Sequence, residues 1–200
     1  MGIKEFNVKT ERFYSAHHTL LRLARSNLET AKTKAPGWRD CQFSSITLSS
    51  LAVEAFCNAV GGRVIDNWSD FESCSPIAKT RLISEKLNIN YQTNKEPWGS
   101  IIFLCKTRNL IAHPKPQPII FEATLTEEEH QNQEFRNPPQ SKLENRMTLA
   151  NATKSVEAVE KLIDLFCGKL TPEQNFGIVG DMWSSSSTFH DGLLRNKPLN

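Results

Sequence analysis

The sequence predicts an all-α protein, a four- to five-helix bundle with a long irregular loop before the last helix. Two observations predict this class: apolar residues recur at helical spacings of three and four along most of the chain, and Gly or Pro pairs separate these stretches. The 200 residues, 38% hydrophobic and 23% charged, have the composition of one globular domain. We therefore expect a helical domain over residues 1–170 and a poorly ordered C-terminal tail over residues 171–200.

The first two helices are expected over residues 12–34 and 43–60. The first carries a single apolar stripe, which predicts a helix with one buried face. The second is apolar on nearly every side, which is typical of a helix at the centre of a bundle. We expect Gly61-Gly62 to end it, because glycine tolerates the left-handed conformation that follows many helices.

The remaining helices are delimited by proline and glycine. A shorter helix is expected over residues 75–87 and a second central helix over residues 97–112, which Pro114 ends because the residue before a proline is pushed away from helical dihedrals. The last helix is expected over residues 146–167. Between them, the loop 114–145 holds five of the ten prolines, and its segment 118–125 is interpreted either as a short strand or as a packed loop.

Composition excludes several classes of protein. A formal net charge of +2 is too small for a nucleic-acid coating protein, and the N-terminus lacks the apolar core of a signal peptide. No apolar run is expected to approach the length of a membrane span. The five widely separated cysteines form no CxxC pair, so we expect neither disulfides nor a zinc site. We therefore expect a cytoplasmic protein with no metal, no other cofactor and no membrane contact.

Two of the apolar helices each carry a small polar patch. One patch contains Glu54 and Asn58, and the other contains Arg108, Asn109 and His113. A buried polar group without a partner costs roughly 1–3 kcal/mol, so we expect the two patches to meet. The residues alone leave two interpretations open: an architectural ion pair between helices, which is the commoner reason for such clustering, or a functional site.

The segment Cys105-Lys106-Thr107-Arg108-Asn109-Leu110-Ile111-Ala112-His113 resembles the signature of HEPN domains, in which an arginine, commonly followed by asparagine, precedes a histidine by four to six residues. The run LSSLAVEAFCNAV, with Glu54 and Asn58, resembles the acidic and amide positions of the second HEPN helix. The resemblance covers residues 12–167 in helix order. It implies a bundle that dimerises through its motif-bearing helices. Many HEPN domains are metal-independent endoribonucleases, including toxins and phage-defence effectors.

The resemblance also implies roles for single residues. It makes His113 the catalytic histidine, Arg108 the phosphate-binding arginine and Asn109 the residue that orients them. Lys115 occupies the position at which one HEPN subgroup carries a tyrosine that a partner nucleotidyltransferase modifies, and we expect it to contact a phosphate instead. Histidine exchanges protons near neutral pH, and the planar guanidinium of arginine matches phosphate oxygens, so the set suits RNA cleavage by the 2′-hydroxyl.

We therefore expect a homodimeric HEPN-type endoribonuclease that acts on RNA, as a toxin or phage-defence effector with an antitoxin or another regulatory partner. The alternative is a non-catalytic HEPN domain that binds a nucleotide, RNA or a protein partner. Fold alone does not establish activity, so both interpretations stay open at this point.

Overall fold

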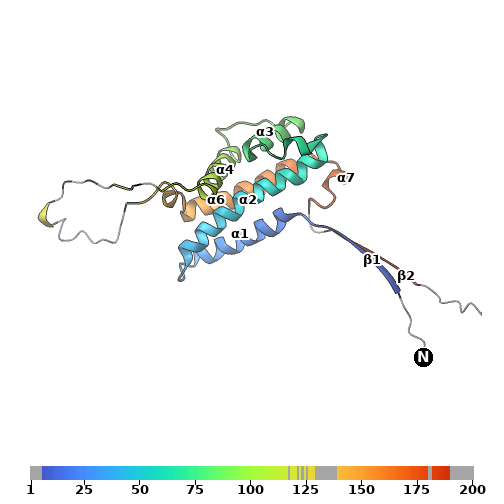
Figure 1. The fold of residues 1–200 in the computed structure, drawn as a ribbon, viewed down its shortest axis with the longest axis horizontal. Coiled ribbons are helices and arrows are strands. Elements are labelled where there is room, and N and C mark those ends of the chain that lie inside the picture. The colour runs from blue at the N-terminus through green and yellow to red at the C-terminus, as the bar shows by residue number, and fades with distance from the viewer. Residues whose placement is uncertain are drawn as a thin grey trace, which may run out of the picture.

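The computed structural model describes residues 6–116, 118–120, 122, 124, 126–128, 139–179 and 182–189. The described residues confirm the expected all-α bundle with an irregular segment before the last long helix (Figure 1). Its long helices are α1 (Ala16–Lys32), α2 (Trp38–Val64), α3 (Pro76–Lys86), α4 (Trp98–Ala112) and α6 (Leu149–Cys167). Smaller elements complete it: the 3₁₀ helices η1 (Trp68–Phe71) and η2 (Glu144–Arg146), the short α7 (Pro172–Asn175), and the strands β1 (Phe6–Phe13) and β2 (Met182–Phe189).

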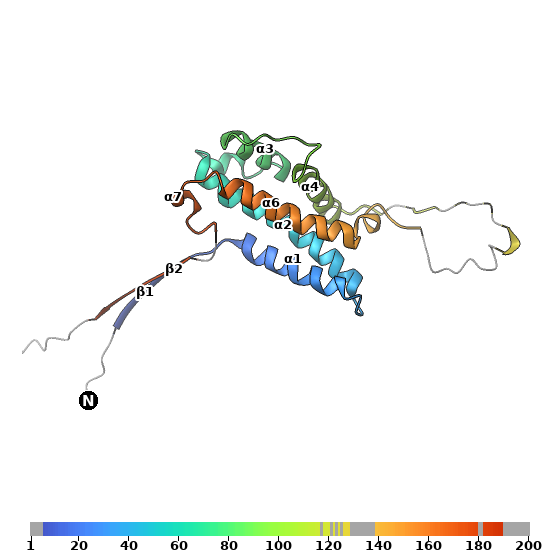
Figure 2. The same ribbon diagram turned by 180° about the vertical axis from the view of Figure 1, so that it is seen from behind.

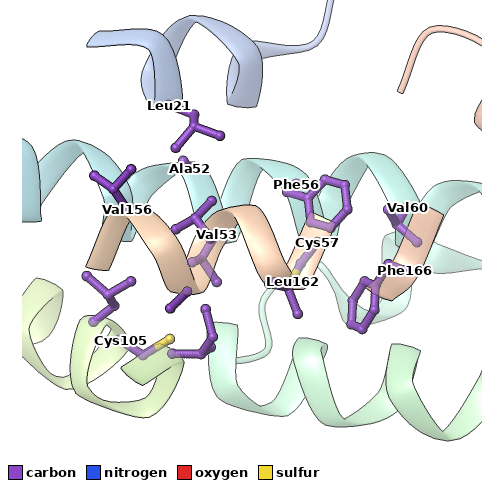
Figure 3. Packing of buried hydrophobic residues seen from close by; sticks show 14 of the residues in the cluster. Leu21, Ala52, Val53, Phe56, Cys57, Val60, Cys105, Val156, Leu162 and Phe166 are labelled. Atoms are coloured by element: carbon purple, nitrogen blue, oxygen red, sulfur yellow. The ribbon is translucent and has the colours of Figure 1, made fainter. Parts of the chain in front are cut away.

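Helix α2 is the centre of the bundle. It packs against α1, α3, α4 and α6, and α6 in turn contacts α1 and α4 (Figures 1 and 2). Most of the apolar residues of α2 are buried among those of its neighbours, as the sequence predicted for a central helix, while Phe43 and Leu51 are exposed. Phe56 of α2 stacks on Phe166 of α6 with ring centroids 5.8 Å apart (Figure 3). Each such side chain contributes about 1.5–3 kcal/mol through its burial, which makes α2 the rigid support for the polar residues it carries.

The predicted end of α2 at Gly61-Gly62 is wrong. The helix runs through both glycines to Val64 and ends at Ile65, which has extended dihedrals. Gly61 is buried, and a Cβ atom added there would lie 2.5 Å from the indole ring of Trp68. The first glycine of the pair therefore admits Trp68 against the helix backbone, which is a packing role and not a terminating one.

By length and composition α2 could also cross a membrane, and it is the one helix of the described chain that meets this test. The expectation that no apolar run approaches this length was therefore wrong. Half of the apolar stretch is buried inside the bundle, and the helix contacts each of the other long helices. This is the environment of a core helix in a globular domain, where apolar character on all sides is expected.

Part of the segment 171–200, where the sequence predicts a poorly ordered tail, has defined structure. Thr171 caps α7 through a reciprocal pair of hydrogen bonds with Gln174, and Ile178 is fully buried. The carbonyl oxygen of Ile178 lies 3.2 Å from Nε2 of the buried His17, which ties this segment to the start of α1. Strand β2 pairs antiparallel with β1 and forms a two-stranded ribbon that extends away from the bundle (Figures 1 and 2). Residues 180, 181 and 190–200 lie outside the described residues.

The segment that follows α4 contains no strand where the structure describes it. Residues 118–120, 122 and 124 have neither helical nor extended pairing, which favours the loop interpretation over the strand for these positions. The rest of 118–125 lies outside the described residues. Residues 139–148 lead through η2 to α6, which begins at Leu149 and is capped by the side chain of Thr148. The last long helix therefore begins three residues later than expected.

Candidate functional site

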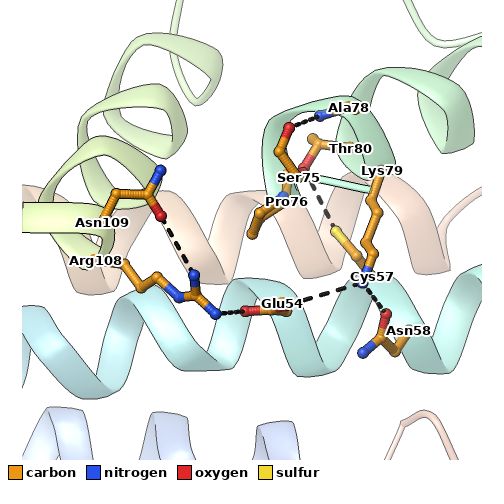
Figure 4. Close-up of polar contacts among 10 residues, drawn as sticks. All are labelled: Glu54, Cys57, Asn58, Ser75, Pro76, Ala78, Lys79, Thr80, Arg108 and Asn109. Carbon is orange, nitrogen blue, oxygen red and sulfur yellow. Dashed lines mark hydrogen bonds and ion pairs between the residues drawn. The ribbon is translucent and has the colours of Figure 1, made fainter. Parts of the chain in front are cut away.

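The two polar patches of the sequence meet between α2 and α4. The Nη2 atom of Arg108 donates to Oε2 of Glu54 over 3.2 Å, and the Nη1 atom donates to the side-chain oxygen of Asn109 over 3.3 Å (Figure 4). The side chains of Glu54 and Arg108 remain 26% and 33% exposed. The guanidinium of Arg108 has five N–H donors, and these two hydrogen bonds use only part of them. Its remaining N–H groups donate to no other described residue. An anion that reaches this face thus finds donors already fixed in place.

A buried lysine that the sequence analysis did not single out completes the cluster. Lys79 of α3 is 1% exposed, and its Nζ atom donates to Oδ1 of Asn58 over 2.9 Å. The same Nζ atom lies 3.9 Å from Oε1 of Glu54 (Figure 4). Asn58 therefore binds Lys79 and not the α4 residues that the sequence suggested. The available signal was position: Lys79 is three residues after Pro76 and four before Ile83, both buried on the same helix face.

The electrostatic balance of this cluster is positive. Lys79 and Arg108 carry two positive charges, and Glu54, the one carboxylate among the described residues that pairs with them, carries a single negative charge. The sum of two positive charges and one negative charge is +1. Lys79 is buried, so the excess positive charge of the cluster is accessible to solvent at the partly exposed Arg108. The site can therefore attract an anionic group without losing the ion pair that holds Arg108 in place.

Two cysteines lie close to the cluster, and burial makes them poor nucleophiles. Burial raises the pKa of the Cys57 thiol to about 11, against the lowering effects of its contact with Thr80 and of the charge on Lys79. Burial likewise raises the pKa of Cys105 to about 12. The thiolate is the reactive form of cysteine, so both groups act as small core side chains at neutral pH.

The motif histidine occupies the end of α4. His113 has the non-helical dihedrals φ −129° and ψ 58°, and its backbone N–H donates to the carbonyl oxygen of Asn109 over 3.0 Å. Its side chain is exposed, and so is Lys115 two residues later. Within the described chain, no hydrogen bond or ion pair joins either side chain to the Glu54–Arg108 pair. The structure thus brings together Glu54, Arg108 and Asn109, and leaves the imidazole and the Lys115 ammonium accessible near the same helix end.

The chemical capacity of this helix end follows from these positions. An exposed imidazole can take or give a proton, and a partly exposed guanidinium can bind phosphate oxygens. Neither group is enclosed in the bundle, so both are accessible to a ligand from solvent. Comparison of the chain with models of protein families, with curated proteins and with solved structures found no match. The functional interpretation therefore depends on the motif and on the geometry of these residues.

Proposed function

We propose that this chain is a metal-independent endoribonuclease of the HEPN type, in which His113 and Arg108 cleave RNA by attack of the 2′-hydroxyl. The observation that carries the proposal is the accessibility of both motif side chains at one end of α4, with the Arg108 guanidinium already positioned by Glu54 and Asn109. A side chain that is held in place before the substrate arrives stabilises developing charge without reorganising, which is the condition for efficient electrostatic catalysis.

In the proposed reaction, His113 removes the proton of the ribose 2′-hydroxyl. The 2′-oxygen forms a bond to phosphorus, and the bond between phosphorus and the 5′-oxygen breaks. The leaving 5′-oxygen takes a proton from an acid, and the products are a 2′,3′-cyclic phosphate and a 5′-hydroxyl. Arg108 binds the nonbridging oxygens while negative charge increases on them. The reaction requires one base and one acid, and each chain supplies one motif histidine.

This requirement makes a homodimer the proposed working unit, with His113 of the second copy as the acid. The surface of α4 supports this arrangement. Ile102, Leu110 and Ile111 stay partly exposed although the helix packs against α2, α3 and α6. A helix that keeps apolar residues at its surface beside a polar motif is suited to an isologous contact around a two-fold axis.

The test is cleavage of a labelled RNA by the purified protein in the presence of EDTA, with identification of the product ends. Wild-type protein should leave cyclic phosphate ends, and His113→Ala should lower the rate by about 10²–10⁴-fold, the usual contribution of a positioned acid or base. His113 is exposed, so the variant should keep its circular dichroism spectrum. His18→Ala, which removes a half-buried histidine of α1 whose ring contacts that of His17, is the control; once its circular dichroism spectrum shows that it is folded, it should cleave normally. Undiminished cleavage by the His113 variant would rule out the assigned role.

One observation favours the second candidate, a HEPN domain that binds a nucleotide, RNA or a protein partner without turnover. The Glu54 carboxylate already forms an ion pair with Arg108, as an architectural pair between helices would. Under this alternative, RNA binding should persist in wild-type protein while no cleavage product accumulates in either chelator or Mg²⁺. Arg108→Lys distinguishes the two candidate functions further. Lysine keeps the positive charge but lacks the planar guanidinium that would bind the scissile phosphate through two hydrogen bonds.

A further inference from the structure

A groove of about 570 Å³ lies along α4 and shares Asn109 with the cluster. Its lining is strongly basic and contains no acidic side chain: Lys106, Asn109, Leu110, Lys142, Asn145 and Arg146. The three cations belong to two different parts of the chain, α4 and the segment that leads into α6. Helix packing therefore brings together positive charges that the sequence keeps more than 30 residues apart.

Arg146 is fixed in the wall of this groove. Its Nη1 atom donates to Oγ1 of Thr107 over 2.8 Å and lies 3.5 Å from the carbonyl oxygen of Phe103, and its guanidinium lies 5.1 Å from the centroid of the Phe103 ring. The Nε and Nη2 groups donate to no described residue. A guanidinium held in this way has little conformational freedom left before any ligand binds, and its open edge matches a phosphate group.

The carboxylate nearest in sequence does not neutralise the groove. Glu144 is exposed and does not line it; its Oε2 atom accepts the backbone N–H of Ser141 over 2.7 Å. The hydrogen bonds from Ser141 lower the pKa of the Glu144 carboxyl. Lys142 and Lys106 are exposed and form no ion pair with any described residue. Two exposed ammonium groups and one guanidinium held by hydrogen bonds thus line the same groove.

Asn109 connects the groove to the candidate site, because its side chain lines the groove and accepts the hydrogen bond from Arg108. We infer that this groove binds the backbone of a single RNA strand, with Lys106, Lys142 and Arg146 on phosphates that flank the one bound at Arg108. The inference rests on the proposed ribonuclease function. Contacts with phosphate groups carry no sequence information, so this surface strengthens binding without choosing a sequence.

The experiment measures binding of a fluorescein-labelled 12-nucleotide oligouridylate to the full chain in the His113→Ala background, which prevents turnover. Lys106→Gln combined with Lys142→Gln should weaken binding about fivefold at low salt, since exposed pairs are individually weak. The slope of log K against log salt should become shallower by about 1.4, or 0.7 for each phosphate of the single strand that a lysine no longer neutralises. Lys161→Gln on α6 is the control; it lies 12 residues beyond Leu149, about 18 Å along the helix, and should change neither value.

The outcomes separate the inference from the proposed function. Unchanged affinity and slope in the double variant would overturn the groove assignment, while cleavage by wild-type protein would still support the nuclease. Binding of uridine monophosphate as tight as that of the 12-mer would also overturn it, because the groove would then hold a free nucleotide and not a strand. If neither binding nor cleavage of any RNA is observed, both proposals fail. A slope of log K against log salt that becomes shallower in the groove variants, and not in the Lys161 variant, supports binding of an RNA strand along the groove.

Discussion

Removing the carboxylate of Glu54 should destabilise the fold through a lysine on another helix. Glu54→Gln keeps the shape of the side chain and an oxygen that accepts from Arg108, but it leaves the 1%-exposed Lys79 without an opposite charge. At the observed 3.9 Å, the attraction between Lys79 and Glu54 is about 4 kcal/mol at an effective dielectric constant of about 20. The 3.2 Å contact with Arg108 gives about 5 kcal/mol on the same basis.

Both attractions are gross values that desolvation and solvent screening offset. Removal of one partner from a buried pair is known to cost about 3–5 kcal/mol, because the other charge stays buried alone. Glu54 is 26% exposed and Asn58 still accepts from Lys79, so we expect the lower end, about 3 kcal/mol. For a chain of this size, that destabilisation corresponds to a decrease in Tm of about 6–12 °C.

The assay is urea unfolding at pH 7, followed by far-UV circular dichroism. Glu157→Gln, which removes an exposed carboxylate from α6, is the control and should change the free energy of unfolding by less than about 0.5 kcal/mol. Lys79→Met removes the buried charge itself and should be nearly neutral. Adding it to Glu54→Gln should therefore restore most of the stability. An additive double variant, or a decrease below about 0.5 kcal/mol in Glu54→Gln, would refute the reasoning.

Two further predictions concern the core. Gly61→Ala should lower the free energy of unfolding by about 1–3 kcal/mol, because the added Cβ meets the Trp68 ring. Gly62→Ala should raise the free energy of unfolding by about 0.5–1 kcal/mol, because the added Cβ has space there. Equal shifts of the urea midpoint in the two variants would contradict this contrast. Stability should fall as pH rises from 9 towards 11, since folded Cys57 and Cys105 keep protons that the unfolded chain releases, at about 1.4 kcal/mol per pH unit each. Burial also raises the pKa of the Cys167 thiol to about 11, so this group adds to the decrease. Replacing all three thiols with alanine should flatten this dependence in urea titrations at each pH.

The helices could be predicted from sequence because their signals are local. Stripes at spacings of three and four locate α1 and α6, and the Ser75-Pro76 pair places the start of α3 to within a residue. The end of α2 could not be predicted in the same way. A glycine pair has the same local appearance whether it ends a helix or admits a bulky ring, and only the position of Trp68 decides between the two.

The candidate site was partly predictable for a related reason. Polar residues on two apolar helices indicated that Glu54 and Arg108 meet, because buried polar groups need partners. Lys79 was missed because a lysine on a short helix ordinarily extends into solvent, and its pairing depends on how α3 packs against α2. The basic groove was missed because Lys106 and Lys142 come together only after α4 packs beside the segment before α6.

The pairing of β1 with β2 has a consequence for the order of folding. Phe6 pairs with Phe189, so these strands close a loop that spans nearly the whole described chain. In the unfolded chain, closing this loop costs more entropy than forming any helix contact. In the folded bundle, the contact of His17 with Ile178 already brings the end of β1 near the start of β2. The ribbon should therefore assemble after the helices, starting at its bundle end, and its amide hydrogens should exchange with solvent long before those of α2.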